Sequence, residues 1–193
     1  KSRNIFSSVT SQISEGSEKN LKIIDINVEE KPTGEISAGA GIGTDGGSFA
    51  FNIRENNWLG EGKNVAFDIE VNEESLKGSI NYVNPNYNFL GNSLGYSLSS
   101  TTNDKPDQGF ENTIVAASVD TRFEQYKDLY AKLGLSASYD DLQTLDSASA
   151  SLKKQSGEFT ELSANYGFSI DKRNRAFMPT DGSVVSFDQS IPL

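Results

Sequence analysis

The sequence predicts an all-β fold: an antiparallel up-and-down transmembrane β-barrel, present as its incomplete N-terminal half. The first observation is a two-residue alternation that runs through nine segments from about residue 33 onward, as in Val65, Phe67, Ile69 and Val71 set against Ala66, Asp68 and Glu70. A period of two is typical of strands with one apolar and one polar face. The second observation is that charges and amides occupy mid-strand positions, so the polar face must meet water. Such strands, apolar outside and wet inside, are typical of a barrel wall.

The composition agrees with this fold class. The chain has 193 residues, a formal net charge of −10, 35% hydrophobic residues and a mean hydropathy of −0.48. No segment approaches the roughly 18 consecutive apolar residues that a spanning helix requires. A barrel can be this polar because only alternate residues of each strand face lipid.

The residue types present argue against enzymatic chemistry. The chain has no cysteine and no histidine, which excludes thiolate and imidazole metal sites and any nucleophile paired with a histidine. The acidic balance argues against nonspecific nucleic-acid binding. Asp68, Glu70 and Glu161 fall on the polar face, where we expect them to line a lumen together with Arg54 and Lys77. We predict no catalytic residues, no metal and no cofactor; the loop carboxylates Asp45, Asp140, Asp141 and Asp146 could meet divalent cations, but a solvated acidic surface is favoured.

Residues 1–32 differ from the remainder and are expected to form the end of a small α+β module. Residues 5–9 could end a short amphipathic helix and enter a strand, residues 14–20 have turn composition, and residues 21–30 alternate as a strand. Pro32 cannot donate to a strand ladder and stiffens the boundary at residues 29–34. The domains are therefore predicted as 1–32 and 33–193. Both ends have the composition of interior segments, so we expect a piece of a longer protein.

Nine strands are expected after this boundary. Their predicted ranges are 34–43, 48–56, 63–72, 75–83, 92–101, 111–121, 128–139, 159–170 and 183–191. The connectors alternate between two classes. One class is polar and variable in length, at residues 44–47, 72–74, 101–108 and 140–158. Each connector of the other class carries an aromatic residue: Trp58, Tyr87 with Phe89, Phe123 with Tyr126, and Phe177. Outer-membrane barrels have short periplasmic turns, longer outer loops and aromatic girdles, so this asymmetry favours a barrel.

The first predicted barrel strand is unusually small and glycine-rich. It comprises Ile36, Ser37, Ala38, Gly39, Ala40, Gly41, Ile42 and Gly43. Glycine weakens a strand because it adds backbone freedom and removes side-chain packing. Two interpretations remain open: a curved or crowded position in the wall, or a strand that pairs loosely so that its edge can open.

Several segments together resemble the BamA-type outer-membrane protein assembly factors. Residues 29–35 resemble the junction between the last periplasmic POTRA module and the first barrel strand. Residues 55–62 match the family's N-[WF]-L-G-x-G turn through Asn57, Trp58, Leu59 and Gly60. Asn84 and Pro85 resemble the N-P-Y turn, with Asn86 as an insertion. Residues 175–183 resemble the R-x-x-F-P-T-D-G-S turn through Phe177, Pro179, Thr180, Asp181 and Gly182, with Met178 as an extra residue.

This resemblance implies a Gram-negative outer-membrane protein whose N-terminal segment lies in the periplasm. The whole protein would be a sixteen-stranded barrel with POTRA modules that folds and inserts other barrel proteins. Its partners would be membrane lipid, unfolded outer-membrane proteins and periplasmic lipoprotein subunits of an assembly complex. Residues 36–43 would form a lateral gate. The family's inward loop with a V-R-G-F type motif is not in this sequence, so we expect this piece alone to be inactive.

Two other functions remain open from the residues. A passive pore, or a secretion or translocation channel of the same superfamily, would have the same wall. A soluble β-sandwich, such as an adhesin or a carbohydrate binder, would instead bury the apolar faces against a second sheet. In that case Phe67, Ile69, Tyr166 and Phe168 would lie in a dry interior.

Overall fold

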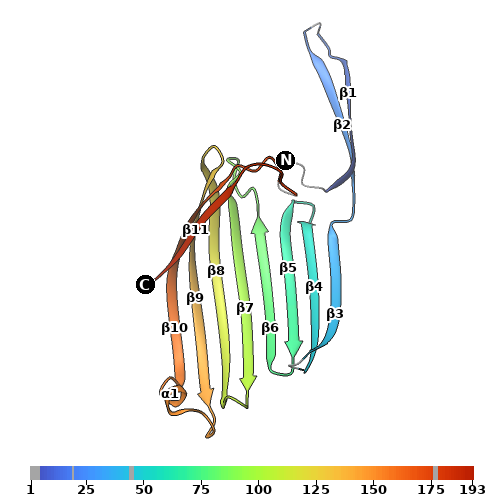
Figure 1. Cartoon of the computed structure of the whole chain (residues 1–193). Coiled ribbons are helices and arrows are strands. Elements are labelled where there is room, and N and C mark those ends of the chain that lie inside the picture. The colour runs from blue at the N-terminus through green and yellow to red at the C-terminus, as the bar shows by residue number, and fades with distance from the viewer. Residues whose placement is uncertain (1–4, 19, 44–45, 176–177) are drawn as a thin grey trace.

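Nine strands of the described part of the chain form one antiparallel sheet, in which strands that follow one another in sequence lie side by side (Figure 1). The computed structural model describes residues 5–18, 20–43, 46–175 and 178–193. The strands are β3 (Gly34–Gly43), β4 (Gly46–Trp58), β5 (Lys63–Asn72), β6 (Ser75–Asn84), β7 (Ser93–Lys105), β8 (Phe110–Tyr126), β9 (Leu129–Thr144), β10 (Gly157–Asp171) and β11 (Val184–Pro192). The predicted up-and-down order is confirmed. The sheet is open, with β3 and β11 at its two edges.

Some strands extend beyond the predicted ends. The expected loops at residues 101–108, 122–127 and 140–158 are partly strand, because β7 continues to Lys105, β8 to Tyr126 and β9 to Thr144. In these strands the alternation of apolar residues ends before the backbone pairing between neighbouring strands does. Polar side chains bond across the extended part, where Asn103 Nδ2 donates to Asn112 Oδ1 at 2.9 Å and the Thr102 and Thr113 hydroxyls lie 3.1 Å apart. Strand pairing here depends on the backbone and on polar pairs, which an apolar pattern does not reveal.

The strand register gives the sheet one apolar and one polar face. Directly paired residues of antiparallel strands point to the same face. One row across the sheet reads Ile36, Ile53, Phe67, Ile80, Leu98, Ala117, Ala137 and Leu162. The adjacent row, on the opposite face, reads Ser37, Asn52, Asp68, Ser79, Ser99, Ala116, Ser138 and Glu161. The alternation read from the sequence is therefore continued from strand to strand.

The apolar face has no second layer against it in the described part of the chain. Leu135 is 50% exposed and Phe168 is 47% exposed, and no large side chain among the described residues is fully buried. Phe67, Ile69, Tyr166 and Phe168 therefore do not lie in a dry interior, and the β-sandwich alternative is wrong for this part of the chain. A face of this kind needs an apolar surrounding outside the chain.

The polar face is crossed by hydrogen bonds between neighbouring strands. Asp68 accepts from Asn52 Nδ2 on β4 and from Ser79 Oγ on β6, the latter at 3.3 Å. Lys77 Nζ lies 3.8 Å from a Glu70 carboxylate oxygen. The predicted position of Asp68, Glu70 and Lys77 on the polar face is confirmed. These bonds satisfy polar side chains that would be costly to bury alone.

The N-terminal region is a separate two-stranded hairpin of β1 (Phe6–Glu15) and β2 (Lys22–Glu30). The expected short helix near residues 5–9 is wrong within the described residues, because Phe6–Glu15 pairs along its length with β2 and is thereby held extended. Its assignment to a POTRA module stays a prediction. The one helix in the described part is α1 (Ala150–Lys153), with Ser149 as its N-cap, inside the β9–β10 connector. Among the described residues, no helix is long and apolar enough to cross a bilayer.

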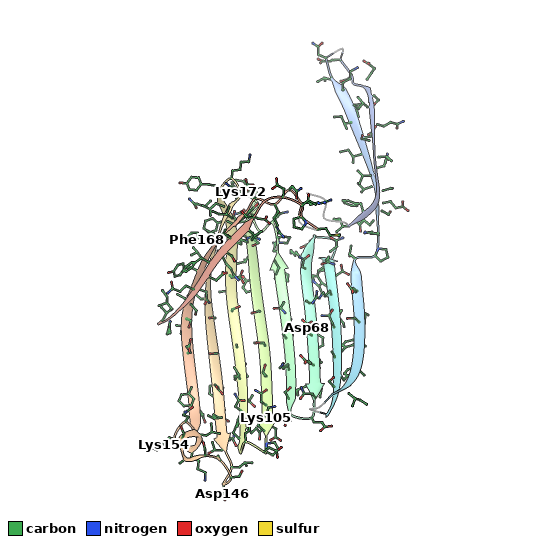
Figure 2. All side chains as sticks on the ribbon, in the orientation of Figure 1. Asp68, Lys105, Asp146, Lys154, Phe168 and Lys172 are labelled. Carbon is green, nitrogen blue, oxygen red and sulfur yellow. The ribbon has the colours of Figure 1, made fainter. Side chains whose placement is uncertain are left out.

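The two classes of connector lie at opposite ends of the sheet. Of the connectors that are described throughout, the aromatic ones after β4, β6 and β8 share an end with the β1–β2 hairpin, and the polar ones after β5, β7 and β9 lie at the other (Figure 1). In Figure 2, Lys172 lies at the hairpin end, whereas Lys105, Asp146 and Lys154 lie at the far end. At the far end the β7–β8 turn contacts the β9–β10 loop, since Leu145 N donates to Gly109 O at 2.8 Å. The connectors therefore divide as the sequence predicted.

Candidate functional site

The free edge of β3 is the candidate site. β3 pairs with β4 from Gly34 opposite Glu55 to Gly43 opposite Gly46, and its other side has no strand partner in the described part of the chain. Figure 1 shows it at the margin of the sheet. All ten of its residues are exposed, and Ile42 is 95% exposed. Such an edge presents unpaired backbone N–H and C=O groups that can bind another strand.

The side chains of β3 pack weakly on the polar face. The register puts Ile36, Ala38, Ala40 and Ile42 on the apolar face and Ser37, Gly39, Gly41 and Gly43 on the polar face. A side-chain Cβ built at Gly39 or at Gly43 would meet no heavy atom within 4 Å. This half of the strand is held mainly by its backbone bonds to β4 and adds little side-chain packing.

The other end of β3 is held by side-chain bonds. Thr33 Oγ1, just before the strand, donates to Glu55 Oε1 on β4, and Asn56 Nδ2 donates to Thr33 O at 3.3 Å. Glu55 Oε1 also accepts from Asn57 N at 2.7 Å. The sequence prediction included residues 29–35 and 55–62 as two separate motifs but assigned Thr33 and Glu55 no role. The two motifs lie at the start of β3 and at the end of β4, which pair with each other. This proximity was the signal from which a contact between Thr33 and Glu55 could have been predicted.

The turn at Asn57–Gly60 is built on one asparagine. Asn57 Oδ1 accepts from Gly62 N at 2.7 Å, and Asn57 O accepts from Gly60 N at 2.9 Å. Leu59 has a φ of 56°, a left-handed conformation that is uncommon for a bulky residue. Trp58 is 44% exposed at the end of β4. The motif residues therefore form a compact β4–β5 turn beside the start of β3.

Asparagines also organise the turn between β6 and β7. Asn84 Oδ1 accepts from Asn86 N at 3.2 Å, and Asn88 Oδ1 accepts from Leu90 N at 3.1 Å. Pro85, the remaining residue of this motif, is half-buried. These hydrogen bonds lie within the turn, which joins β6 to β7 and not the strands of the edge site.

The connector between β10 and β11 forms the last predicted motif. Asn174 Nδ2 donates to Thr180 Oγ1 at 2.9 Å, and Asn174 N donates to Asp181 O at 3.1 Å. Phe177 lies outside the described residues, and Pro179 is exposed. Gly182 has a φ of 94°, and a Cβ there would lie 2.2 Å from Lys172 O. The hydrogen bonds of Arg173 to the Asp171 carboxylate raise the pKa of its guanidinium above the ordinary value.

The predicted site residues thus fall into two groups. Glu55 links the start of β3 to the Asn57–Gly60 turn through its bonds to Thr33 and Asn57, whereas the other two turn motifs join different strand pairs, β6–β7 and β10–β11. In the described ranges, no three acidic side chains come close enough to hold a metal ion, and Asp45 lies outside those ranges.

The comparisons with known proteins identify the family. The model of the Omp85 superfamily domain matches residues 57–193. This chain belongs to the Omp85 superfamily. It is 24% identical over 171 residues to the outer membrane protein assembly factor BamA of Neorickettsia risticii (strain Illinois), covering 86% of this chain and 23% of that protein. The chain thus spans about a quarter of the curated relative.

A solved structure has the same fold. The crystal structure of BamA from Haemophilus ducreyi lacking POTRA domains 1–3 superposes with a TM-score of 0.77 at 20% identity, covering 99% of this chain and 40% of that one. The predicted BamA-type resemblance and the antiparallel sheet of a barrel wall are confirmed. At this level of identity the structural likeness concerns the fold alone.

We expect Gly182→Ala to destabilise the β10–β11 turn. A left-handed conformation costs an L-residue about 1–2 kcal/mol, and here the new methyl group would also meet the Lys172 carbonyl. Gly47→Ala is the matched control, because its Cβ would meet no atom within 4 Å. The measurement is the urea midpoint of the full-length protein refolded in detergent micelles. Equal midpoints for the two variants would contradict the structure of this turn.

Proposed function

We propose that the full-length protein is an outer-membrane assembly factor that folds and inserts other barrel proteins through a lateral gate at β3. Membership of the Omp85 superfamily supports the general activity, and a matched relative carries the name of an assembly factor. Because the chain spans 23% of that relative, the proposal concerns the whole protein and not this segment alone.

The free β3 edge carries the proposal. A substrate strand that enters lipid must satisfy its backbone N–H and C=O groups, since no water is available there. An edge strand offers those partners by β-augmentation. The glycines at 39, 41 and 43 support this role, because a strand with little side-chain packing separates from a partner at low cost. The driving force would be hydrogen bonding in lipid, with no cofactor.

The remaining partners follow from the two faces and the two ends. The apolar face would contact membrane lipid, and the polar face would line the lumen. The hairpin end would be periplasmic, with β1–β2 as part of the last POTRA module and periplasmic lipoprotein subunits bound nearby. The exposed apolar side of the hairpin, formed by Val9, Ile13, Ile24, Ile26 and Val28, supports a location against other parts of such a module.

A passive pore or a translocation channel of the same superfamily is the second candidate. The charged side chains of Asp68, Glu70 and Lys77 on the polar face favour it, because a charged lumen suits an aqueous pore. The two candidates differ in the need for a mobile edge. If stiffening β3 by Gly39→Val leaves both ion conductance and the assembly of other barrels unchanged, the pore is favoured.

We expect substrate strands to cross-link to the β3 edge. Photo-crosslinking residues at Ala38 and Ala40 in the full-length protein should capture a barrel substrate stalled during assembly, because these residues lie on an unpaired edge. Position Glu70 on β5 is the matched control, since β5 is paired on both sides. Capture at Glu70 alone would rule out the gate.

We also expect the two faces to respond differently to charge. Leu135→Arg, at the middle of the apolar side of β9, should destabilise the bilayer-inserted protein by about 2–4 kcal/mol, the cost of a cation at the lipid midplane of a barrel. Ser138→Arg, on the polar face opposite Glu161, is the control and should be tolerated. Denaturant titration in lipid vesicles measures both. Similar losses for the two variants would argue against lipid at the apolar face.

A further inference from the structure

The linker between the hairpin and the sheet is bonded at both of its ends. It has three residues, Lys31, Pro32 and Thr33, between β2 and β3. Lys31 N donates to Ile5 O of the hairpin region at 3.1 Å. Thr33 bonds to the sheet instead, through its hydroxyl to Glu55 and through its carbonyl to Asn56. The linker therefore joins two separate structural units by fixed contacts.

Few backbone torsions of this linker are free. The ring of Pro32 fixes its φ, and the residue before a proline is restricted to extended conformations, which constrains Lys31. Thr33 is the remaining residue, and it is the one that the sheet binds. The direction in which the hairpin leaves the sheet then depends on the contact between Thr33 and Glu55.

Glu55 breaks the pattern of the face on which it lies. Its row across the sheet continues through Val65, Tyr82, Tyr96, Val119, Leu135 and Ala164, all apolar or aromatic. A carboxylate in such a row is costly unless it is hydrogen-bonded. Here Thr33 and Asn57 supply the bonds, and Gly34 leaves the space, since a Cβ there would lie 3.0 Å from Glu55 Oε2.

We propose that Thr33 and Glu55 form a clamp that fixes the direction of the β1–β2 hairpin relative to the sheet and holds the first residues of β3 in place. Loosening of the edge strand is then confined to its glycine-rich half, residues 39–43. Glu55 is a positioning residue: it acts on the hairpin through Thr33. The consequence for the gate rests on the proposed function, whereas the clamp itself does not.

The test measures the hairpin direction in the full-length protein in lipid nanodiscs. Spin labels at Gln12→Cys on β1 and Lys127→Cys in the β8–β9 turn report one distance, and both positions are exposed. The printed chain has no native cysteine to interfere. Pulsed electron spin resonance should give a narrow distance distribution for the parent. Thr33→Val and Glu55→Ala, which remove the donor and the acceptor, should broaden it.

Conservative variants and controls make the test specific. Thr33→Ser and Glu55→Gln keep a donor hydroxyl and an acceptor oxygen, so both should retain the narrow distribution. Thr102→Val removes a threonine hydroxyl bonded elsewhere, to Thr113, and Glu61→Ala removes a carboxylate from the same turn that bonds Lys63 instead of the linker. Both controls should match the parent.

Hydrogen exchange gives a second readout at the start of β3. Loss of one hydrogen bond of about 1 kcal/mol corresponds to about fivefold faster exchange of the amides of residues 34–38 in Thr33→Val. The isosteric Thr33→Val variant decides the outcome if Glu55→Ala does not fold. A distance distribution as narrow as that of Thr102→Val, with unchanged exchange, would overturn the clamp.

The clamp and the gate fail in different experiments. A broadened distribution in Thr33→Val, together with no substrate capture at Ala38 or Ala40, would support the clamp and overturn the gate. An unchanged distance distribution in Thr33→Val, together with normal substrate capture at Ala38 and Ala40, would overturn the clamp and support the gate.

Discussion

A sheet that is apolar on one side places a strict demand on its backbone. Within hydrocarbon no water can satisfy an N–H or a C=O group, so each strand depends on its two neighbours for its hydrogen bonds. The nine strands meet this demand by pairing in sequence order, and β3 and β11 are the two edge strands of the sheet that results. The strand pairing that stabilises the sheet therefore leaves its edges as the places where the backbone can bind another strand.

The division between the two faces is maintained from strand to strand. Rows of apolar and polar side chains alternate across the sheet because each strand register pairs apolar residues with apolar residues and polar residues with polar residues. Polar pairs such as Asp68 with Ser79 satisfy one another on one face. Glu55 departs from this order, and its bonds to the linker and to the adjacent turn account for the departure.

The first strand of the sheet combines two opposed properties. At its start, the bonds of Thr33 to Glu55 and Asn56 hold it against β4, and Gly34 leaves the space that the Glu55 carboxylate occupies. Towards its end, Gly39 and Gly43 have no side chains to pack. A strand that is held by side-chain bonds at one end and weakly packed at the other can move at its weakly packed end without detaching from the sheet. This arrangement suits the proposed gate, and it places the control of the hairpin direction next to it.

The nine strands of the sheet, its two faces and its two classes of connector could all be predicted from the residues, because a period of two and the chemistry of turn residues are local properties of the chain. The glycines of residues 39–43 also marked β3 as unusual among larger alternating side chains, but its place at the edge of the sheet came from the strand pairing. The sequence did not determine the ends of β7, β8 and β9, where the backbone ladder and polar pairs extend past the apolar pattern. Only the tertiary structure brought Thr33 to Glu55, 22 positions apart, because which side chains meet depends on the register of β3 with β4 and on the direction of the linker.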